Sequence, residues 1–239
     1  MGRIGLIQTK GVGDILIALP IAAAFTQGGN RVLWPVDEKF AGFLQAAAPY
    51  VEFLPVRRSE DMLDYLYTEP QRLLRERGCD EVLVLYSQLT GGHADKVQKP
   101  RIAEFLKFDE YKYAVAGVPF SEKWNLQIER DRAREEALFG SLGIERDYIC
   151  VHRRASIFVG ELNLPPEWRN DYQVIEVDER TSSPFDWILA FERAAKLVLI
   201  DSLFANLVEQ LGLPNEKYLM LRSPGSLTPV FRNGWNFLA

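Results

Sequence analysis

A short loop near the amino terminus holds the residues with the clearest chemical potential: Lys10, Gly11, Gly13 and Asp14. An Ile- and Leu-rich run precedes the loop and a helix-like apolar pattern follows it, so a strand, a tight turn and a helix are expected. In an open parallel sheet such a turn lies at the carboxyl end of the strand, where ligands bind. The helix then directs its free N–H groups at the ligand.

Asp14 has two interpretations from its position alone. It could be the N-cap of the helix that starts there, a position where Asp is favoured. Alternatively, its carboxylate lies at the mouth of a ligand site, where it can take a proton from an attacking hydroxyl.

The glycines of this loop match neither common nucleotide fingerprint. Gly11 and Gly13 lack the third glycine of the dinucleotide pattern, because Ile17 occupies that neighbourhood, and no Gly-Lys-Ser/Thr of a Walker loop follows. A ligand site and a plain tight turn therefore both stay open, whereas a dinucleotide-dependent oxidoreductase is disfavoured.

A second group of polar residues follows two strand-like segments, 147–152 and 197–200, in the other half of the chain. The group comprises Arg153, Arg154, Ser156, Asp201 and Ser202. The two arginines could bind phosphate, although one of them could make only a surface ion pair. Asp201, with Ser202, could cap the next helix while holding a ligand loop.

Strand-like and helix-like patterns alternate around these residues. The other expected strands cover residues 31–34, 51–54, 81–86, 172–177 and 218–221. The expected helices include 38–48, 71–77, 184–195 and 205–211. This alternation predicts Rossmann-like α/β units, with mostly parallel sheets and helices on both faces.

Local signals add detail to this pattern. Pro35 and Pro55 are expected to end the strands before them, and Ser59 to cap a helix that Pro70 breaks or kinks. The charged segment 129–136 is expected to be a solvated helix face. One helical face should carry three apolar residues, Ile102, Phe105 and Leu106, while the core should hold Trp187 and Phe191.

At 239 residues, the chain is long enough for one large domain or two smaller ones with separate cores. The two series of strands and helices predict two similar α/β halves, residues 1–125 and 126–239. A cleft between two such units is the expected ligand site.

Composition narrows the class of protein. A hydrophobic share of 47% and a charged share of 26% are typical of a soluble globular protein, and the net charge of -5 argues against charge-driven attachment to nucleic acid or an acidic membrane. Since the sequence shows no secretory leader and no apolar run of roughly 20 residues, a cytoplasmic protein is expected. Cys79 and Cys150 stand far apart, which predicts structural thiols and no disulfide or zinc site.

Residues 8–20 resemble the opening motif of the heptosyltransferase-like glycosyltransferases. In that motif, a strand, a small-residue loop and Gly-Asp-Val/Ile lead into a helix with an Ala/Thr-Leu-Pro signature. The resemblance implies a GT-B-like fold, in which two Rossmann-like domains with mostly parallel sheets face each other across a cleft. It also implies that Asp14 is the catalytic base.

The second half resembles the donor-binding domain of the same family. Residues 194–202 are similar to a strand that ends in Asp-Ser/Thr-Gly, where a helix N-terminus meets the donor diphosphate, and residues 151–156, 164–168, 212–214 and 221–224 continue the likeness. The implied donor- and phosphate-binding residues are Lys10, Gly11, Gly13, Arg153, Arg154, Ser156, Asp201, Ser202, Leu203 and Phe204. Residues 1–125 then form the acceptor side and 126–239 the nucleotide-binding domain.

Three positions depart from the family pattern. Leu203 replaces a glycine, Asn206 replaces a histidine, and Leu164 replaces a tryptophan. The chain is also shorter than typical members. These departures keep a second function class open, a non-catalytic GT-B-like binding or assembly protein.

The resemblance implies transfer of a sugar from a nucleotide-diphosphate sugar to an acceptor hydroxyl. Such a reaction needs a base for the hydroxyl and positive charge or N–H dipoles for the departing phosphate. One base is enough for direct displacement with inversion, and the sequence has no Asp-x-Asp cluster. No metal and no cofactor are therefore expected.

The acceptor is expected to be a glycan or another hydroxyl-bearing molecule. His93 could contact it, although an isolated loop histidine is often merely exposed. Basic residues around the same loop, Lys96, Lys99, Arg101 and Lys107, leave a nucleic-acid acceptor as a minor alternative.

Overall fold

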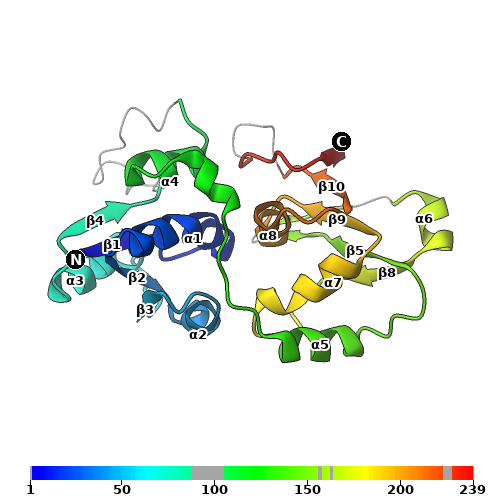
Figure 1. Ribbon diagram of the computed structural model, residues 1–239, viewed down its shortest axis with the longest axis horizontal. Coiled ribbons are helices and arrows are strands. Elements are labelled where there is room, and N and C mark those ends of the chain that lie inside the picture. The colour runs from blue at the N-terminus through cyan, green and yellow to red at the C-terminus, as the bar shows by residue number, and fades with distance from the viewer. Residues whose placement is uncertain (1, 88–104, 156–157, 162–163, 223–227, 239) are drawn as a thin grey trace. The chain divides into compact units, whose positions relative to one another are not determined.

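The computed structural model describes residues 2–87, 105–155, 158–161, 164–222 and 228–238. The chain divides into two compact units, Met1–Glu129 and Arg130–Ala239. Each unit is an α/β layer in which helices pack against a parallel sheet (Figure 1). The expected α/β class with parallel sheets is therefore confirmed.

The first unit contains a four-stranded sheet in the order β3-β2-β1-β4, with every pair parallel. Its strands are β1 (Arg3–Ile7), β2 (Arg31–Asp37), β3 (Val51–Val56) and β4 (Glu81–Val84). Its helices are α1 (Val12–Gln27), α2 (Glu38–Ala47), the π-helical turn η1 (Asp64–Thr68), α3 (Glu69–Glu76), α4 (Phe108–Ala116) and the 3-10 helix η3 (Phe120–Trp124). Because the strands are parallel, their carboxyl ends lie along one edge of the sheet.

Helix α1 forms the centre of the first core. Its residues from Ile15 to Ala23 are all buried, so the helix is apolar around its whole circumference. Pro20 lies inside this helix, and the Tyr113 hydroxyl of α4 donates a hydrogen bond to the Ile17 carbonyl at 2.8 Å. Helix α4 is thereby joined to the middle of α1.

The prolines do not end their strands as expected. Pro35 and Pro55 lie inside β2 and β3, where Pro35 pairs with Leu54 across the two strands. Strand β3 is at the edge of the sheet, and β2 pairs with β1 only as far as Leu33. A missing N–H is tolerated at such positions because the strand has a neighbour on one side only.

The predicted helix cap at Ser59 is also wrong by two residues. The Asp61 carboxylate accepts from the backbone N–H groups of Leu63 and Asp64, at 2.9 and 3.2 Å, while the Ser59 hydroxyl accepts from Asp61. Pro70 does not break the helical run, which continues without a gap from the π-helical turn η1 into α3; the change from π- to α-helix falls at Glu69, the residue before Pro70.

The second unit contains a five-stranded parallel sheet in the order β11-β10-β9-β5-β8 and a two-stranded antiparallel hairpin, β6-β7. Its strands are β5 (Tyr148–His152), β6 (Arg154–Ala155), β7 (Phe158–Val159), β8 (Gln173–Glu176), β9 (Lys196–Ile200), β10 (Glu216–Met220) and β11 (Trp235–Leu238). Its helices are α5 (Arg132–Ser141), α6 (Pro166–Asp171), the 3-10 helix η4 (Pro184–Trp187), α7 (Ile188–Arg193) and α8 (Leu203–Leu211).

Strand β11 is a feature that the sequence pattern missed. The carboxylate of Glu209, a fully buried residue of α8, accepts from the backbone N–H of Arg232 at 2.9 Å and from the indole N–H of Trp235 at 2.7 Å. These contacts hold the chain where it enters β11, and they join residues more than twenty positions apart, which no local pattern reports.

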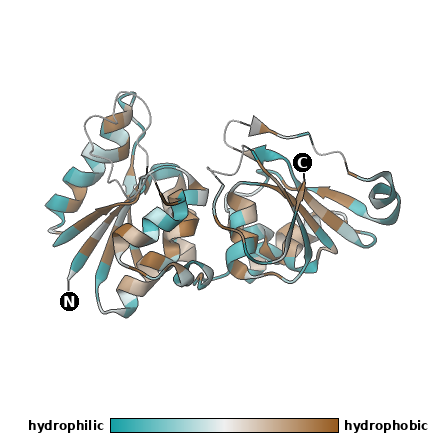
Figure 2. Cartoon of the chain, turned by 90° about the horizontal axis from the view of Figure 1, so that it is seen from above, coloured by the Kyte–Doolittle hydropathy of each residue, from teal (hydrophilic) through white to brown (hydrophobic). Residues whose placement is uncertain are grey.

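The hydrophobic residues are gathered in the strands and on the helices beside them (Figure 2). Trp187 and Phe191 are fully buried with their rings stacked 6.2 Å apart, which confirms their predicted place in the core. Phe105, in contrast, lies outside any described helix with 83% of its surface exposed, so its predicted helical face is wrong. Ile102 lies outside the described residues.

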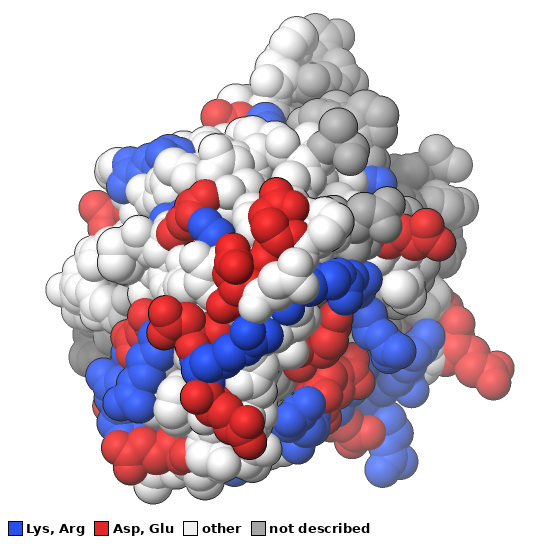
Figure 3. Space-filling view, turned by 90° about the vertical axis from the view of Figure 1, so that its right-hand side faces the viewer, with Lys and Arg blue, Asp and Glu red and all other residues white. Residues whose placement is uncertain are grey.

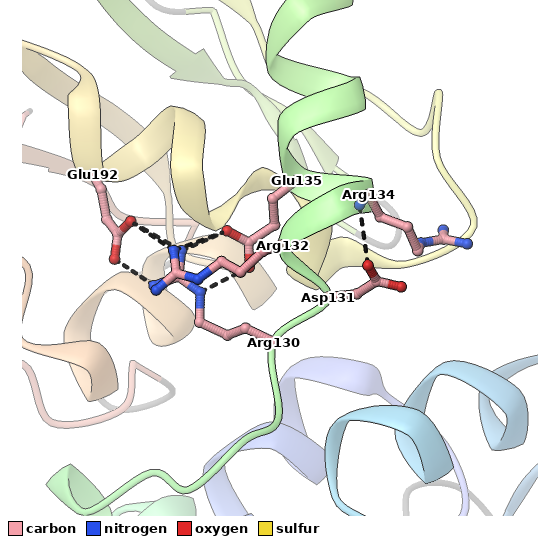
Figure 4. A network of polar contacts seen from close by, with 6 residues as sticks. All are labelled: Arg130, Asp131, Arg132, Arg134, Glu135 and Glu192. Atoms are coloured by element: carbon pink, nitrogen blue, oxygen red, sulfur yellow. Dashed lines mark hydrogen bonds and ion pairs between the residues drawn. The ribbon is translucent and has the colours of Figure 1, made fainter.

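Most of the charged segment 129–136 is exposed, as predicted, but Arg130 and the buried Glu135 belong to a network at the start of α5 (Figure 4). Arg130 donates two hydrogen bonds, at 2.7 and 2.6 Å, to the carboxylate of Glu135, whose surface is 1% exposed. Arg130 also donates to Glu192 of α7 at 2.5 Å. The network therefore ties the first turn of α5 to α7.

Elsewhere on the second unit, charges are balanced over short distances. On the face drawn in Figure 3, basic and acidic side chains are interspersed rather than segregated. Ion pairs such as Arg180–Asp178, at 2.7 Å, are half-exposed and contribute little to stability. A mixed surface of this kind favours solubility over binding of a single polyion.

We expect Glu135→Gln to lower the free energy of unfolding by about 1–3 kcal/mol, because it removes the buried charge that Arg130 requires. Glu136→Gln, a change at the exposed neighbour in the same helix, should stay within about 0.5 kcal/mol of the wild type. Urea unfolding of the two variants measures the difference. Equal free energies of unfolding for the two variants would show that the Arg130–Glu135 contact does not stabilise the protein.

Candidate functional site

The loop after β1 is shaped by Gly11. This residue is the N-cap of α1 and has a φ of 85°, a conformation that glycine adopts without the strain caused by a Cβ atom. Asp14 lies in the first turn of the helix, three residues further on, and no side-chain cap bond is made among the described residues of this helix end. The N-cap interpretation of Asp14 is therefore wrong.

The Asp14 carboxylate is partly accessible and has a charged partner. Its side chain is 40% exposed, and Oδ1 lies 3.2 Å from the Nζ of Lys112, which is itself only 2% exposed. Lys112 belongs to α4 and also donates to the Gln8 side-chain oxygen at 2.6 Å and to the Leu85 carbonyl at 3.1 Å. Sequence reasoning missed Lys112, because a lone lysine between two tyrosines in a helix carries no motif.

Backbone and side-chain bonds fix the rest of the loop. The Lys10 N–H donates to the Tyr86 hydroxyl at 3.0 Å, and the Gln8 amide donates to the Lys10 carbonyl at 2.8 Å. Burial raises the pKa of Tyr86, which keeps its hydroxyl neutral. The Lys10 side chain is exposed, so this loop presents a cation and a carboxylate at the carboxyl end of β1.

In the second unit, the turn between β9 and α8 has a comparable position. Ser202 is the N-cap of α8, yet within this described helix end its side chain makes no cap hydrogen bond; its Oγ lies 3.2 Å from Nδ1 of His152. The preceding Asp201 is buried, with an oxygen 3.8 Å from Nη2 of Arg222. A helix end without a side-chain cap leaves N–H groups and the positive end of the dipole for an anion.

His152 packs at the end of β5. Its ring meets the ring of Phe204 edge-on, with 4.7 Å between centroids. Burial, and secondly the charge of Arg154, lowers the pKa of His152 to about 4. The imidazole is therefore neutral at physiological pH.

The two arginines after β5 have different surroundings. Arg153 pairs with Glu176 of β8, with Nη2 3.0 Å from Oε1, so an ion pair exists at this position. Arg154 is exposed and lies in the hairpin strand β6. Two candidate residues, Ser156 and His93, lie outside the described residues.

The remaining donor-side candidates belong to the first turn of α8. Leu203 and Phe204 are its first two residues, and Phe204 is buried against His152. Asn206, which stands where the family has histidine, donates to the Ser202 carbonyl at 2.8 Å. The structure thus gathers Asp201, Ser202 and Phe204 with His152 in one unit.

Two structural expectations concern thiols and ions. Cys79 and Cys150 are free thiols, and burial raises the pKa of Cys150. Across the described ranges, His, Cys, Asp and Glu side chains form no group of three that could hold a metal ion. None of the described helices is long and apolar enough to cross a membrane.

Comparison with known proteins shows which solved structures share this architecture. No protein-family model and no curated protein matches the chain. Among solved structures, a glycosyl transferase family 9 protein from Veillonella parvula DSM 2008 is similar over 99% of this chain and 86% of its own, with a TM-score of 0.66 and 15% identity.

Two heptosyltransferases of E. coli are also similar. WaaC with ADP-2-deoxy-2-fluoro heptose has a TM-score of 0.56 and 14% identity, over 99% of this chain and 92% of its own. ADP-heptose lps heptosyltransferase II has a TM-score of 0.51 and 11% identity, over 98% and 92%. At these identities the likeness shows the fold, so the expected GT-B-like α/β architecture is confirmed.

The lowered pKa of His152 predicts a pH dependence of stability. The unfolded histidine titrates near 6.5 and the folded one near 4, so between these values the unfolded chain binds a proton that the folded chain does not. Stability should fall as the pH drops from 6.5 toward 4, by about 3 kcal/mol at most, and this loss should level off below pH 4.

Urea unfolding across this pH range, compared between wild type and His152→Gln, isolates the contribution of His152 from that of the carboxylates. In NMR spectra, the His152 imidazole signal is identified because it is absent from the variant. In the wild type, this signal should titrate near pH 4. Titration near 6.5 would contradict the buried, neutral state.

Proposed function

We propose that this protein is an inverting glycosyltransferase, which moves a sugar from a nucleotide-diphosphate sugar to an acceptor hydroxyl with Asp14 as the general base. The observation that carries the proposal is the partly exposed Asp14 carboxylate at the carboxyl end of β1, in a fold shared with heptosyltransferases. Ligands of open parallel sheets bind at that end of the strands.

The chemical step needs only one base. The acceptor oxygen attacks the anomeric carbon while the bond from that carbon to the diphosphate oxygen breaks, and the diphosphate leaves with the bonding electrons. The acceptor proton passes to the Asp14 carboxylate. Attack opposite the leaving group inverts the configuration at the anomeric carbon.

The second unit is proposed to bind the donor. The α8 N-terminus without a side-chain cap offers N–H dipoles to a diphosphate, and Arg154 offers an exposed cation near the end of β5. Arg153 and Lys10 are the other cations of the proposed set. Because WaaC has been solved with ADP and with an ADP-heptose analogue, ADP-sugars are the first donors to test.

A non-catalytic binding or assembly protein is the alternative. Leu203 and Asn206 motivate it, because they make the donor turn bulkier and replace an imidazole with an amide. The Asn206 amide is already bonded to the Ser202 carbonyl. This alternative predicts that no sugar nucleotide stabilises the protein.

The acceptor is proposed to be a glycan or another hydroxyl-bearing molecule. A polyanionic acceptor such as nucleic acid stays a minor option. Three of the four basic residues that suggested it, Lys96, Lys99 and Arg101, lie outside the described residues. A cytoplasmic location is likewise proposed from the sequence alone.

Asp14→Asn should lower kcat by roughly 10²–10⁴-fold and leave the donor Kd unchanged, because the amide cannot take the proton from the acceptor. The control is Glu38→Gln, which changes an exposed carboxylate in the first turn of α2. Release of nucleoside diphosphate and calorimetric donor binding measure the two effects. Wild-type turnover by Asp14→Asn would remove the base assignment.

Turnover should also persist after treatment with EDTA, because the positive groups proposed to stabilise the leaving diphosphate are lysine, arginine and the α8 dipole, and not a metal ion. The assay compares chelated protein with and without added Mg²⁺ or Mn²⁺. Activity that is lost on chelation and restored by either cation would contradict a metal-independent reaction.

A further inference from the structure

Lys112 is one of the most deeply buried charged residues of the first unit. Its side chain is 2% exposed, and three oxygen atoms surround Nζ: the Gln8 amide oxygen at 2.6 Å, the Leu85 carbonyl at 3.1 Å and Asp14 Oδ1 at 3.2 Å. An ammonium has three N–H donors, so these three acceptors use its full capacity.

The three acceptors come from different elements. Gln8 directly follows β1, Leu85 directly follows β4, and Asp14 lies in the first turn of α1. Lys112 reaches all of them from α4, so its head group joins one helix to the carboxyl ends of two adjacent strands. Gln8 is itself held by the hydrogen bond that its amide donates to the Lys10 carbonyl at 2.8 Å.

Electrostatics make Asp14 the most important partner for the charge on Lys112. Burial lowers the pKa of Lys112, whereas the Asp14 carboxylate raises it and so favours the ammonium form. Asp109 acts in the same direction more weakly, and its carboxylate is paired with Lys123 at 2.7 Å. The Asp14 carboxylate therefore stabilises the charged form of the buried Lys112.

The other carboxylate oxygen of Asp14, Oδ2, lies in the space beside Gly11. A Cβ atom on Gly11 would stand 2.8 Å from Oδ2, so the carboxylate occupies space that only glycine leaves open. Oδ1 thus lies at Lys112 and Oδ2 beside Gly11, while 40% of the side chain stays exposed.

We propose that Lys112 is a positioning residue, which holds the Asp14 carboxylate by Oδ1 so that Oδ2 faces the acceptor hydroxyl. This inference rests on the proposed function, because it gives Lys112 a role only if Asp14 is the base. Lys112 does not itself touch the substrates. Its effect on the rate arises because a carboxylate displaced by about 1 Å can lose on the order of 10²-fold in rate.

The test compares Lys112→Met with Lys123→Met. Both changes remove a buried ammonium from the same unit, since Lys123 is fully buried against Asp109, so both should lower the melting temperature. Assayed below both melting temperatures, Lys112→Met should lose about 10²-fold in kcat with unchanged donor Kd and KM, while Lys123→Met keeps a near wild-type kcat. Equal losses of kcat, or a wild-type kcat in Lys112→Met, would overturn the positioning role.

A second measurement does not depend on activity or on the folding of a lysine variant. The pKa of Lys112, followed by NMR of its Cε methylene, should fall further in Asp14→Asn than in wild type, because the carboxylate that favours the ammonium is gone. An unchanged pKa would show that the contact is absent in solution. Failure of the proposed function is recognised separately, since the wild type would then show no turnover, or Asp14→Asn would keep the wild-type rate.

Discussion

A lysine ammonium with almost no access to water constrains the loop on which the proposed chemistry depends. Removing such a charge from water costs several kcal/mol, and this cost is offset only where acceptors meet each N–H at good distances. Around Lys112 those acceptors are Gln8, Leu85 and Asp14. The ends of β1 and β4, the first turn of α1 and the face of α4 must therefore take up their positions together.

The second unit also carries polar groups at the carboxyl ends of its strands, but of different types. Its carboxyl strand ends carry a helix start without a side-chain cap at Ser202, a buried carboxylate at Asp201 and a neutral imidazole at His152. The N–H dipoles at the start of α8 supply positive potential there, and Arg222 lies 3.8 Å from the adjacent Asp201 carboxylate. Such an arrangement suits a leaving diphosphate, as proposed.

Much of the fold could be predicted from the sequence because its signals are local. The Ile- and Leu-rich run before Lys10 and the helical pattern after Asp14 identified β1, the loop and α1 with little error. The resemblance to heptosyltransferases added the fold of the whole chain. Errors arose where a residue distant in the sequence determines the local structure. Pro35 is tolerated because β2 has only one neighbour there, and Glu135 is buried where Arg130 joins it to Glu192.

The candidate site shows the same limit. Asp14 could be identified from its spacing, but its place in the first turn depends on Gly11 capping the helix one turn earlier than expected. Lys112 could not be identified, because its partner Gln8 lies 104 residues away in the sequence. The Asp14 carboxylate can therefore be identified from the sequence, whereas its partner Lys112 is visible only in the tertiary structure.

Binding of a sugar nucleotide is the most direct test of the central claim. Thermal unfolding of the wild-type protein should be measured with ADP-, UDP- and GDP-sugars, with calorimetry for any that bind. One nucleotide class should raise the melting temperature, by an amount equivalent to about 2.7 kcal/mol at a ligand concentration of 100 times Kd. If none of the three classes changes the melting temperature, the protein is not a transferase of these donors and the non-catalytic alternative stands.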